Sequence, residues 1–359
     1  MDFKEDWEET KNRFEAWWAG EVLDRPAIQV TAPRADARRK EIPPPPSLEQ
    51  RWTDVAHVIA VTEERFRCAY FGGEAFPCFW PNLGPDVFAA YLGCELIFHE
   101  TTSWARPLIT DWNDPLRVGL DEDNKWWRLT VEFTEAAARA SAGRWFVGLT
   151  DLHGGMDALA AMRGRQSLAL DIVDNPDKIE QAMASLTPLW FQVFERLHGI
   201  AELAIAGSST WLSIWSPGRC YPVSCDFAAL ISPAAFERFI LPDIEAQVNW
   251  LDHSIFHLDG PGALPHLEIL LHLPGLNGIQ WVPGAGSGSM LQWVPMLKTI
   301  QQHGKILHLS VGAEEVEPLL SELSPKGLML STSCASESEA RDLLRRVRQA
   351  RPGKRAVNP

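Results

Sequence analysis

Two segments of the chain combine side chains that could bind a metal or move a proton. The first, residues 254–259, places His257 and Asp259 two positions apart in an apolar run. Because side chains in a strand alternate between its two faces, this imidazole and this carboxylate share one face. The second, residues 328–334, is also apolar and ends in Cys334. An imidazole, a carboxylate and a thiolate can form a three-ligand zinc site that leaves a fourth position open for chemistry. The alternative is a buried His–Asp hydrogen bond beside an unrelated core cysteine.

The elements that would position these residues alternate between strands and helices. Eight apolar runs have strand length, and helical stretches lie between most of them. Such alternation implies parallel strands joined by right-handed crossovers, and eight units in 359 residues favour a (β/α)8 TIM barrel. A doubly wound open sheet is the alternative. The eight runs are residues 26–30, 95–99, 145–151, 210–215, 254–259, 278–282, 305–311 and 327–334.

We expect one TIM-barrel domain over residues 1–359. Residues 1–24 would form an N-terminal helical extension, residues 25–350 the barrel and residues 351–359 a tail. In a barrel, catalytic groups come from the C-terminal ends of the strands. The fifth and eighth strands face each other across the lumen, so the three candidate ligands could meet at its mouth.

The composition excludes several classes of protein. The net charge is −14, so long-range attraction to nucleic acid or to an anionic membrane is not expected. No run of 18 apolar residues occurs, and the acidic N-terminus lacks the features of a secretory signal. The six cysteines are scattered without a Cys-x-x-Cys pair, which is typical of a protein in a reducing cytosol. We therefore expect a cytoplasmic protein without nucleic-acid or membrane partners.

Further residues near the predicted strand ends are candidates for catalysis or substrate binding. His153 follows the third strand, and Tyr221 and Asp226 lie in the loop after the fourth, where Asp226 either contacts substrate or caps the loop. We add His153 and Tyr221 to His257 and Asp259 as catalytic candidates. The chain holds 16 tryptophans, and indoles gathered at one rim would build a pocket for an apolar, aromatic or quaternary ammonium group. The substrate-binding candidates are Trp80, Trp211, Trp215, Gln280, Trp281 and His308.

Short motifs follow one another in a recognisable order along the chain. This order resembles the uroporphyrinogen decarboxylase-like superfamily and, within it, the corrinoid:coenzyme M methyltransferases. The resemblance covers roughly residues 19–350 and implies a TIM barrel. The motifs are Arg25-Pro26 at the first strand, Ser232-Pro233-x-x-Phe236 with Pro242 before the fifth, His257-x-Asp259-Gly260 at the fifth, and the closing segment that ends in Cys334.

The resemblance carries a metal site and a partner with it. In those methyltransferases a His-x-Cys-Gly segment and a further cysteine resemble a zinc site that binds a substrate thiol. His257 and Cys334 match two of these positions, whereas Asp259 stands where the first cysteine would be. A carboxylate makes the metal harder and more Lewis-acidic, which argues against a thiol acceptor. The resemblance also implies a methylcorrinoid on a separate protein as the methyl donor. The Arg-rich signature of the decarboxylase itself is absent from residues 28–34, so porphyrinogen decarboxylation is not expected.

We predict a zinc-dependent methyl (one-carbon) transferase in which His257, Asp259 and Cys334 bind the metal. Its partners would be a small-molecule substrate and a corrinoid protein. The first alternative is a metal-independent decarboxylase or lyase in which His257 and Asp259 act as an acid–base pair on a carboxylated substrate. The second is a non-catalytic binding subunit of a methyltransferase complex. A homodimer is compatible with all three because barrels of this size often self-associate.

Overall fold

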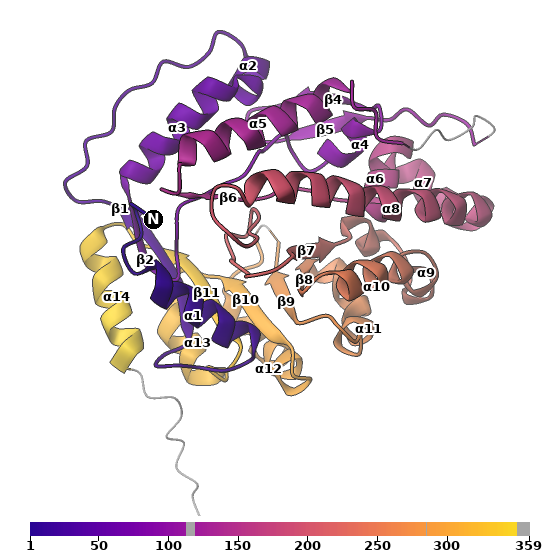
Figure 1. The fold of residues 1–359 in the computed structure, drawn as a ribbon. Helices are drawn as coiled ribbons and strands as arrows, with labels where there is room; N and C mark the ends of the chain where they lie inside the picture. Colours follow the sequence, from indigo (N-terminus) through magenta and orange to yellow (C-terminus); the bar gives the residue numbers. More distant parts are fainter. Residues whose placement is uncertain (113–118, 285, 350–359) are drawn as a thin grey trace, which may run out of the picture.

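The computed structural model describes residues 1–112, 119–284 and 286–349, so the predicted tail 351–359 lies outside the described residues. The chain forms a mixed α/β fold around a central, mostly parallel sheet. The strands occupy the middle of the molecule and the helices surround them (Figure 1). Strands covered by helices on their outer side are expected to be apolar along most of their length. β10 (Ile306–Ser310) and β11 (Leu328–Ser333) are buried in this way.

The central sheet contains seven strands in the described residues. Neighbouring strands are parallel, except that β1 and β2 are antiparallel. Because β1 pairs with β11, the first and last strands of the chain lie side by side in the sheet (Figure 1). The order across the sheet is β2 (Ala69–Gly73), β1 (Ala27–Pro33), β11, β10, β9 (Gly278–Val282), β8 (His253–Asp259) and β7 (Cys220–Ser224).

The helices begin at defined side-chain caps in several cases. Asp54 accepts the amide of His57 at the start of α3, and Asn124 accepts the amides of Trp126 and Trp127 at the start of α5. No helix in the described ranges is long and apolar enough to cross a membrane. The helices are α1 (Trp7–Trp18), α2 (Leu48–Thr53), α3 (Val55–Arg67), α4 (Val87–Tyr91), α5 (Lys125–Ser141), α6 (Gly155–Arg163), α7 (Arg165–Asp174), α8 (Pro176–Ala201), α9 (Pro233–Phe239), α10 (Leu241–Trp250), α11 (Leu267–Leu271), α12 (Val294–Gln302), α13 (Val316–Glu322) and α14 (Glu337–Gln349).

The closed barrel expected from the sequence is not observed as one continuous sheet. Among the described residues the central sheet ends at β2 on one side and at β7 on the other. A separate, short ladder joins β3 (Cys78–Phe79) to β6 (Phe146–Val147) in parallel. Just after β6, the amide of Leu149 donates to the carbonyl of Ser209 over 2.8 Å.

The predicted fourth strand, residues 210–215, is wrong. These residues are irregular, and β7 occupies the corresponding place in the sheet, parallel to β8. Pro222 lies in the middle of β7 and, because proline cannot donate to a ladder, made this run resemble a loop in the sequence. Proline is tolerated here because β7 is at the end of the hydrogen-bonded sheet, where one side of the strand needs no partner.

The predicted second strand is present but lies outside the central sheet. Residues 95–99 correspond to β4 (Glu95–Phe98), which pairs antiparallel with β5 (Ser103–Arg106). In β5 buried and exposed side chains alternate, with exposed Trp104 between buried Ser103 and Ala105, and β4 exposes Glu95 beside buried Leu96. A two-stranded ribbon with one wet face is compatible with antiparallel pairing but not with the buried wall of a parallel sheet.

The predicted N-terminal extension is α1, and it belongs to the apolar core. Trp7 and Phe14 pack against the ring of Phe76. The indole of Trp17 donates to the carbonyl of Gly327 over 3.0 Å, and that of Trp18 donates to the carbonyl of Trp215 over 3.0 Å. Buried indoles usually need such a partner. These tryptophans therefore fasten α1 to two distant parts of the chain.

A buried ion pair fixes the start of β1 against the end of β2. The guanidinium of Arg25 donates two hydrogen bonds of 2.7 Å to Glu74, whose side chain is fully buried. The amide of Ile28 donates to the same carboxylate over 2.7 Å. Gly73 adjoins this pair with φ +61°, and a Cβ there would lie 2.0 Å from the carbonyl oxygen of Ile28. The junction therefore requires both the ion pair and a glycine.

Replacing Glu74 by glutamine should destabilise the protein strongly. Glu74→Gln leaves the Arg25 guanidinium buried without its counter-charge, and breaking a buried pair in this way costs about 3 to 5 kcal/mol. Urea unfolding followed by circular dichroism would measure the loss. The matched control is Glu317→Gln, which breaks a half-exposed pair with Arg346 and should cost less than about 1 kcal/mol. Equal losses in the two variants would contradict the role of the buried pair.

Candidate functional site

A row of polar side chains crosses five neighbouring strands of the sheet. His257 on β8 lies opposite Gln280 on β9, which lies opposite His308 on β10. Gln29 on β1 lies opposite Ser331 on β11. Parallel register keeps side chains in such positions on the same face of the sheet. The strands therefore bring five polar side chains together on one face of the sheet.

Hydrogen bonds join these residues in two groups. Nδ1 of His257 is hydrogen-bonded to Oε1 of Gln280. Nε2 of His308 lies 2.8 Å from Oγ of Ser331, which in turn donates to Oε1 of Gln29 over 2.6 Å. Burial, together with the nearby charge of His257, lowers the pKa of His308 to about 4. The His308 imidazole is therefore neutral at pH 7.

Carboxylates and imidazoles gather where β6, β7 and β8 end. The ligand atoms of Asp226, His257 and Asp259 lie within 4.8 Å of one another, and so do those of His153, Asp157 and Asp226. Asp226 belongs to both groups. Its Oδ1 is buried and has no hydrogen-bond partner among the described residues. An orphaned, buried carboxylate oxygen at the centre of such a cluster is a position where a cation would fit.

Burial and the charges within the cluster shift the pKa values of its histidine and carboxylates. Burial by itself would lower the pKa of His153, but the carboxylates of Asp151, Asp157 and Asp226 outweigh burial and raise this pKa to about 9. Burial raises the pKa of Asp151 and of Asp259. Nε2 of His153 lies 3.3 Å from Asp151. Several negative charges in a small volume therefore hold a proton on His153 when no other cation is present.

Asp157 holds Asp226 in place. Its carboxylate accepts the amides of Asp226 and Phe227, each over 2.8 Å, at the start of the short helix η1 (Asp226–Leu230). Burial raises the pKa of Asp157, with the charge of Asp226 as the second cause. Both Asp157 oxygens are thus used by the backbone, which leaves the Asp226 side chain to face the histidines.

The sequence offered a signal for Asp226 that depended on the correct fourth strand. Asp226 follows directly on β7, and functional groups in this type of sheet lie just after the strands. With the fourth strand placed at 210–215, Asp226 falls deep in a loop and caps it equally well. Asp157 lies on α6, far from any predicted strand end, and no sequence pattern singled it out.

A cavity of about 1050 Å³ lies beside this cluster. The ring of Trp211 lines the cavity and also meets the His257 imidazole edge-on, with the ring centres 5.1 Å apart. Gln280 and His308 line the cavity as well, so it reaches the polar row described above. The predicted site residues in its wall are Trp80, Trp211, Gln280, His308 and Cys334, and its other aromatic residues are Phe66, Phe71 and Phe76.

Three arginines line the same cavity. Arg34, Arg39 and Arg65 form no ion pair with any carboxylate in the part of the chain that the structure describes. All three arginines are exposed, and the charge of Arg34 contributes, after other causes, to lowering the pKa of Glu337. Because a guanidinium binds carboxylate or phosphate groups well, they give this cavity a preference for anions.

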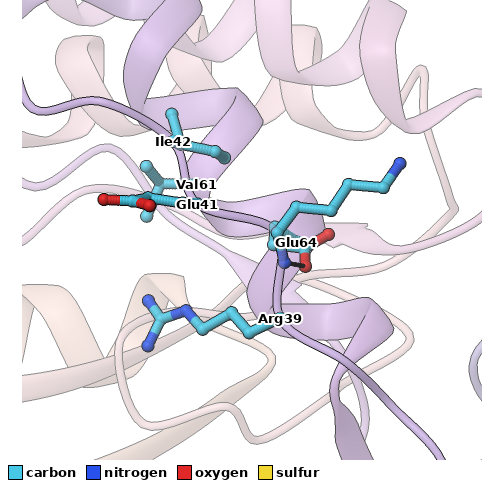
Figure 2. A pocket seen from close by; sticks show the side chains of 6 residues that line it. Arg39, Glu41, Ile42, Val61 and Glu64 are labelled. Atoms are coloured by element: carbon cyan, nitrogen blue, oxygen red, sulfur yellow. Dashed lines mark hydrogen bonds between the residues drawn. The ribbon is translucent and has the colours of Figure 1, made fainter.

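A smaller pocket of about 320 Å³ lies beside α3 and shares Arg39 with the cavity (Figure 2). Glu64 in its wall accepts the amide of Lys40, the dashed contact in Figure 2, and also pairs with Arg67. Through these contacts the Glu64 carboxylate binds the segment before α2 to α3. Glu64 is therefore not available for chemistry in this pocket.

The remaining predicted site residues lie elsewhere. The Tyr221 hydroxyl is buried on β7, where it donates to the carbonyl of Thr150 over 3.0 Å and accepts the amide of Leu152. Trp215 packs in the core beneath α1, and Trp281 is fully buried. Cys334 lies in the cavity wall but belongs to none of the groups of potential metal ligands found in the described residues. Asp226 thus occupies the position beside His257 and Asp259 that the sequence assigned to Cys334.

Comparisons with known proteins give matches among solved structures only. No protein-family model and no curated protein matches the sequence. Among solved structures, a methyltransferase from Methanosarcina mazei is similar with a TM-score of 0.60, over 95% of this chain and 98% of that chain. The two sequences are 14% identical. The match shows that the two proteins share a fold over nearly their whole length.

His308 should make stability depend on pH in a defined window. Its pKa is about 4 when folded and 6.5 when unfolded, so the unfolded chain binds the extra proton between these values. The contribution is complete above pH 6.5 and is lost as the pH falls towards 4. Between pH 7 and pH 5, the wild type should therefore lose about 2 kcal/mol more than His308→Gln, which does not titrate. Urea unfolding of both proteins at the two pH values would test this, and parallel losses would contradict it.

Proposed function

We propose that the protein is a metal-dependent methyl (one-carbon) transferase. The observation that carries the proposal is the convergence of Asp226, His257 and Asp259 beside a large cavity, just after two neighbouring strands. Its fold is shared with a methyltransferase over 95% of the chain, which supports this reaction class. Ligand sites in parallel α/β sheets lie at the same ends of the strands.

We further propose that the fold is a TIM barrel with an interrupted wall. The ladder of β3 and β6, and the bond from Leu149 to Ser209, would complete the wall between β2 and β7. Ser208, next to Ser209, accepts the amide of Cys220 at the start of β7 over 3.1 Å, which supports this closure. On this interpretation the polar row and the acidic cluster both lie inside the barrel mouth.

The residues at the cluster fit a divalent metal held by oxygen and nitrogen. Two carboxylates and one imidazole are ligands that zinc and harder divalent metals accept, and the orphaned Oδ1 of Asp226 lacks any other partner. Bound there, zinc would supply Lewis-acid chemistry and an open coordination position. A thiolate site does not fit equally well, because Cys334 lies outside the group. We therefore assign the ligands to Asp226, His257 and Asp259.

The surrounding residues would orient these ligands and the substrate. Since Oε1 of Gln280 can only accept, Nδ1 of His257 donates to it and leaves the lone pair on Nε2, as a ligating histidine requires. Asp157 holds Asp226, and Trp211 packs against the His257 ring. The aromatic cavity would exclude water from the reacting group, while its arginines would bind an anionic end of the substrate. This favours a small aromatic or apolar compound that carries a carboxylate.

A methylcorrinoid on a separate protein is the partner that we propose for methyl transfer. Its support is the resemblance of the motifs around His257 and Cys334 to the corrinoid:coenzyme M methyltransferases. Among the alternatives, a metal-free acid–base reaction of His257 and Asp259 gains weight only if the purified protein binds no metal.

The metal content of variants would distinguish the site with Asp226 as third ligand from the site with Cys334 as third ligand. We expect about one zinc per chain after reconstitution and desalting, and loss of it in Asp226→Asn and Asp259→Asn, because each change removes a charged ligand. Cys334→Ser is the matched control and should retain the metal. Elemental analysis of the four proteins gives the answer. Loss of zinc in Cys334→Ser alone would restore the thiolate site, and a metal-free wild type would overturn the metal proposal.

Methyl transfer itself can be followed by the absorbance of methylcobalamin. Because a catalyst accelerates both directions of a transfer, the reaction can be followed in reverse, with the corrinoid as the methyl acceptor. Cob(I)alamin would be mixed with the protein and with carboxylated methyl ethers such as 4-methoxybenzoate, which would be released as the phenol. We expect methylcobalamin to form, and Asp259→Asn to slow its formation by more than about 100-fold, because losing a ligand exceeds the effect of losing a residue that orients one. Glu268→Gln, at an exposed carboxylate, should keep the wild-type rate. An Asp259→Asn protein as fast as the wild type would contradict the assigned site.

A further inference from the structure

The side chain of Gln29 has a fixed orientation. Its Nε2 donates to the backbone carbonyl of Ser213 over 2.6 Å. A carbonyl oxygen can only accept, so the amide nitrogen must be the end that faces Ser213. The Gln29 carbonyl, Oε1, therefore points at Ser331, 2.6 Å away.

This orientation determines which nitrogen of His308 carries the proton. Because Oε1 of Gln29 can only accept, Ser331 must use its single proton to donate to it. Oγ of Ser331 can then only accept from His308, whose Nε2 lies 2.8 Å away. His308 must therefore hold its proton on Nε2, and its Nδ1 carries a bare lone pair.

That lone pair has no partner among the described residues. Nδ1 of His308 is buried and has no hydrogen bond within the described ranges of the chain. His308 is 2% exposed and lines the 1050 Å³ cavity. A buried acceptor without a donor costs about 1 to 3 kcal/mol, so its presence beside a cavity needs a reason. His308 lines the cavity while its Nδ1 is covered in the free protein, so a bound molecule can donate to this atom only by displacing the side chains that cover it.

Ser213, whose carbonyl fixes the orientation of Gln29, has an uncommon backbone conformation. Ser213 has φ +51°, in the left-handed region that non-glycine residues seldom adopt. Such conformations persist where the surrounding structure fixes them and tend to occur at functional sites. The strained backbone at Ser213 directs the carbonyl on which the orientation of Gln29, and hence of His308, depends.

We propose that His308 determines substrate specificity by accepting, through Nδ1, a hydrogen bond from a hydroxyl, thiol or amine of the molecule bound in the cavity. Gln29 and Ser331 are positioning residues that keep His308 in the Nε2–H form. This rests on the proposed function only in taking the cavity as the substrate site. A compound with a free hydroxyl satisfies Nδ1, whereas its methyl ether has no proton to give and leaves Nδ1 unpaired. The cavity therefore distinguishes a methylated compound from its demethylated counterpart.

The first test needs no ligand. Full-length protein labelled with ¹⁵N in histidine would be examined by long-range ¹H–¹⁵N correlation at pH 7. We expect His308, identified by its absence from His308→Gln, to show a protonated Nε2 and an unprotonated Nδ1. Ser331→Ala should give a mixture of the two tautomers, a change that a merely structural role for Ser331 does not produce. A proton on Nδ1 in the wild type would overturn the proposal.

The second test uses phenol and anisole, which have the same ring and differ in the donor. Their dissociation constants would be measured by calorimetry on metal-free protein. The ratio of the dissociation constant of anisole to that of phenol would then be compared between variants, because this comparison cancels the difference in hydration of the two compounds. We expect the ratio to fall about 10-fold in His308→Gln, which keeps a donor for Ser331 but loses the acceptor at the Nδ1 position. His308→Asn, whose side-chain oxygen lies near that position, should restore part of the ratio.

An unchanged ratio in His308→Gln would overturn the assignment of the acceptor. Since binding is measured without metal and without a methyl donor, this outcome is independent of methyl transfer. Conversely, a protein that binds phenol as expected but never transfers a methyl group would reject the proposed function and leave the role of His308 intact. Circular dichroism of each variant ensures that folded proteins are compared.

Discussion

The ion pair between Arg25 and Glu74 is the constraint on which the arrangement of the sheet depends. Both charges are buried, so each is tolerated only because the other is present. The pair fixes the start of β1, and β1 in turn joins the last strand, β11, to the antiparallel strand β2. Gln29 follows four residues after Arg25, so the same junction determines where the hydrogen-bonded chain to His308 begins.

The site consists of two neighbouring regions that differ in chemistry. Acidic groups and imidazoles occupy the region after β6, β7 and β8, whereas the cavity beside it is aromatic, with arginines and a neutral histidine in its wall. Trp211 and Gln280 belong to both, since each contacts His257 and also lines the cavity. A group bound in the cavity would therefore meet the candidate metal ligands through two side chains whose orientation is already fixed. Such preorganisation limits the reorganisation needed during reaction.

Local periodicity predicted part of this site correctly. The alternation in residues 254–259 placed His257 and Asp259 on one face of β8, and the last three strands were found close to their observed bounds. Trp80, Trp211, Gln280 and His308, which were predicted to bind substrate, line the cavity, and their role in binding stays a prediction. Trp211 was placed on a fourth strand that does not form, so its position owes nothing to that strand. The strands that were found share a cause, because a strand buried on both faces shows an apolar run that a single sequence reveals.

The rest depended on contacts between distant segments, which one sequence does not contain. Pro222 disguised β7, and with it the significance of Asp226. Whether Cys334 or Asp226 approaches His257 depends on how neighbouring loops fold back, and spacing along the chain does not fix that. Tyr221 and Trp281 have residue types common at active sites, yet here they fill the core. The tautomer of His308 follows from four groups on four separate segments, and only their positions in space reveal it.

Pro222 has a consequence for the behaviour of the protein in concentrated solution. A strand at the end of a sheet can recruit a strand from another molecule through its unpaired backbone groups, and apolar strands of this kind seed aggregates. β7 is buried and apolar at Cys220, Tyr221 and Val223, so it carries that risk whenever its neighbouring segment opens. The proline removes one amide donor from the middle of the strand and interrupts the ladder that an incoming chain would need. The residue that hid β7 from prediction thus also leaves a gap in any ladder that another chain would build on this strand.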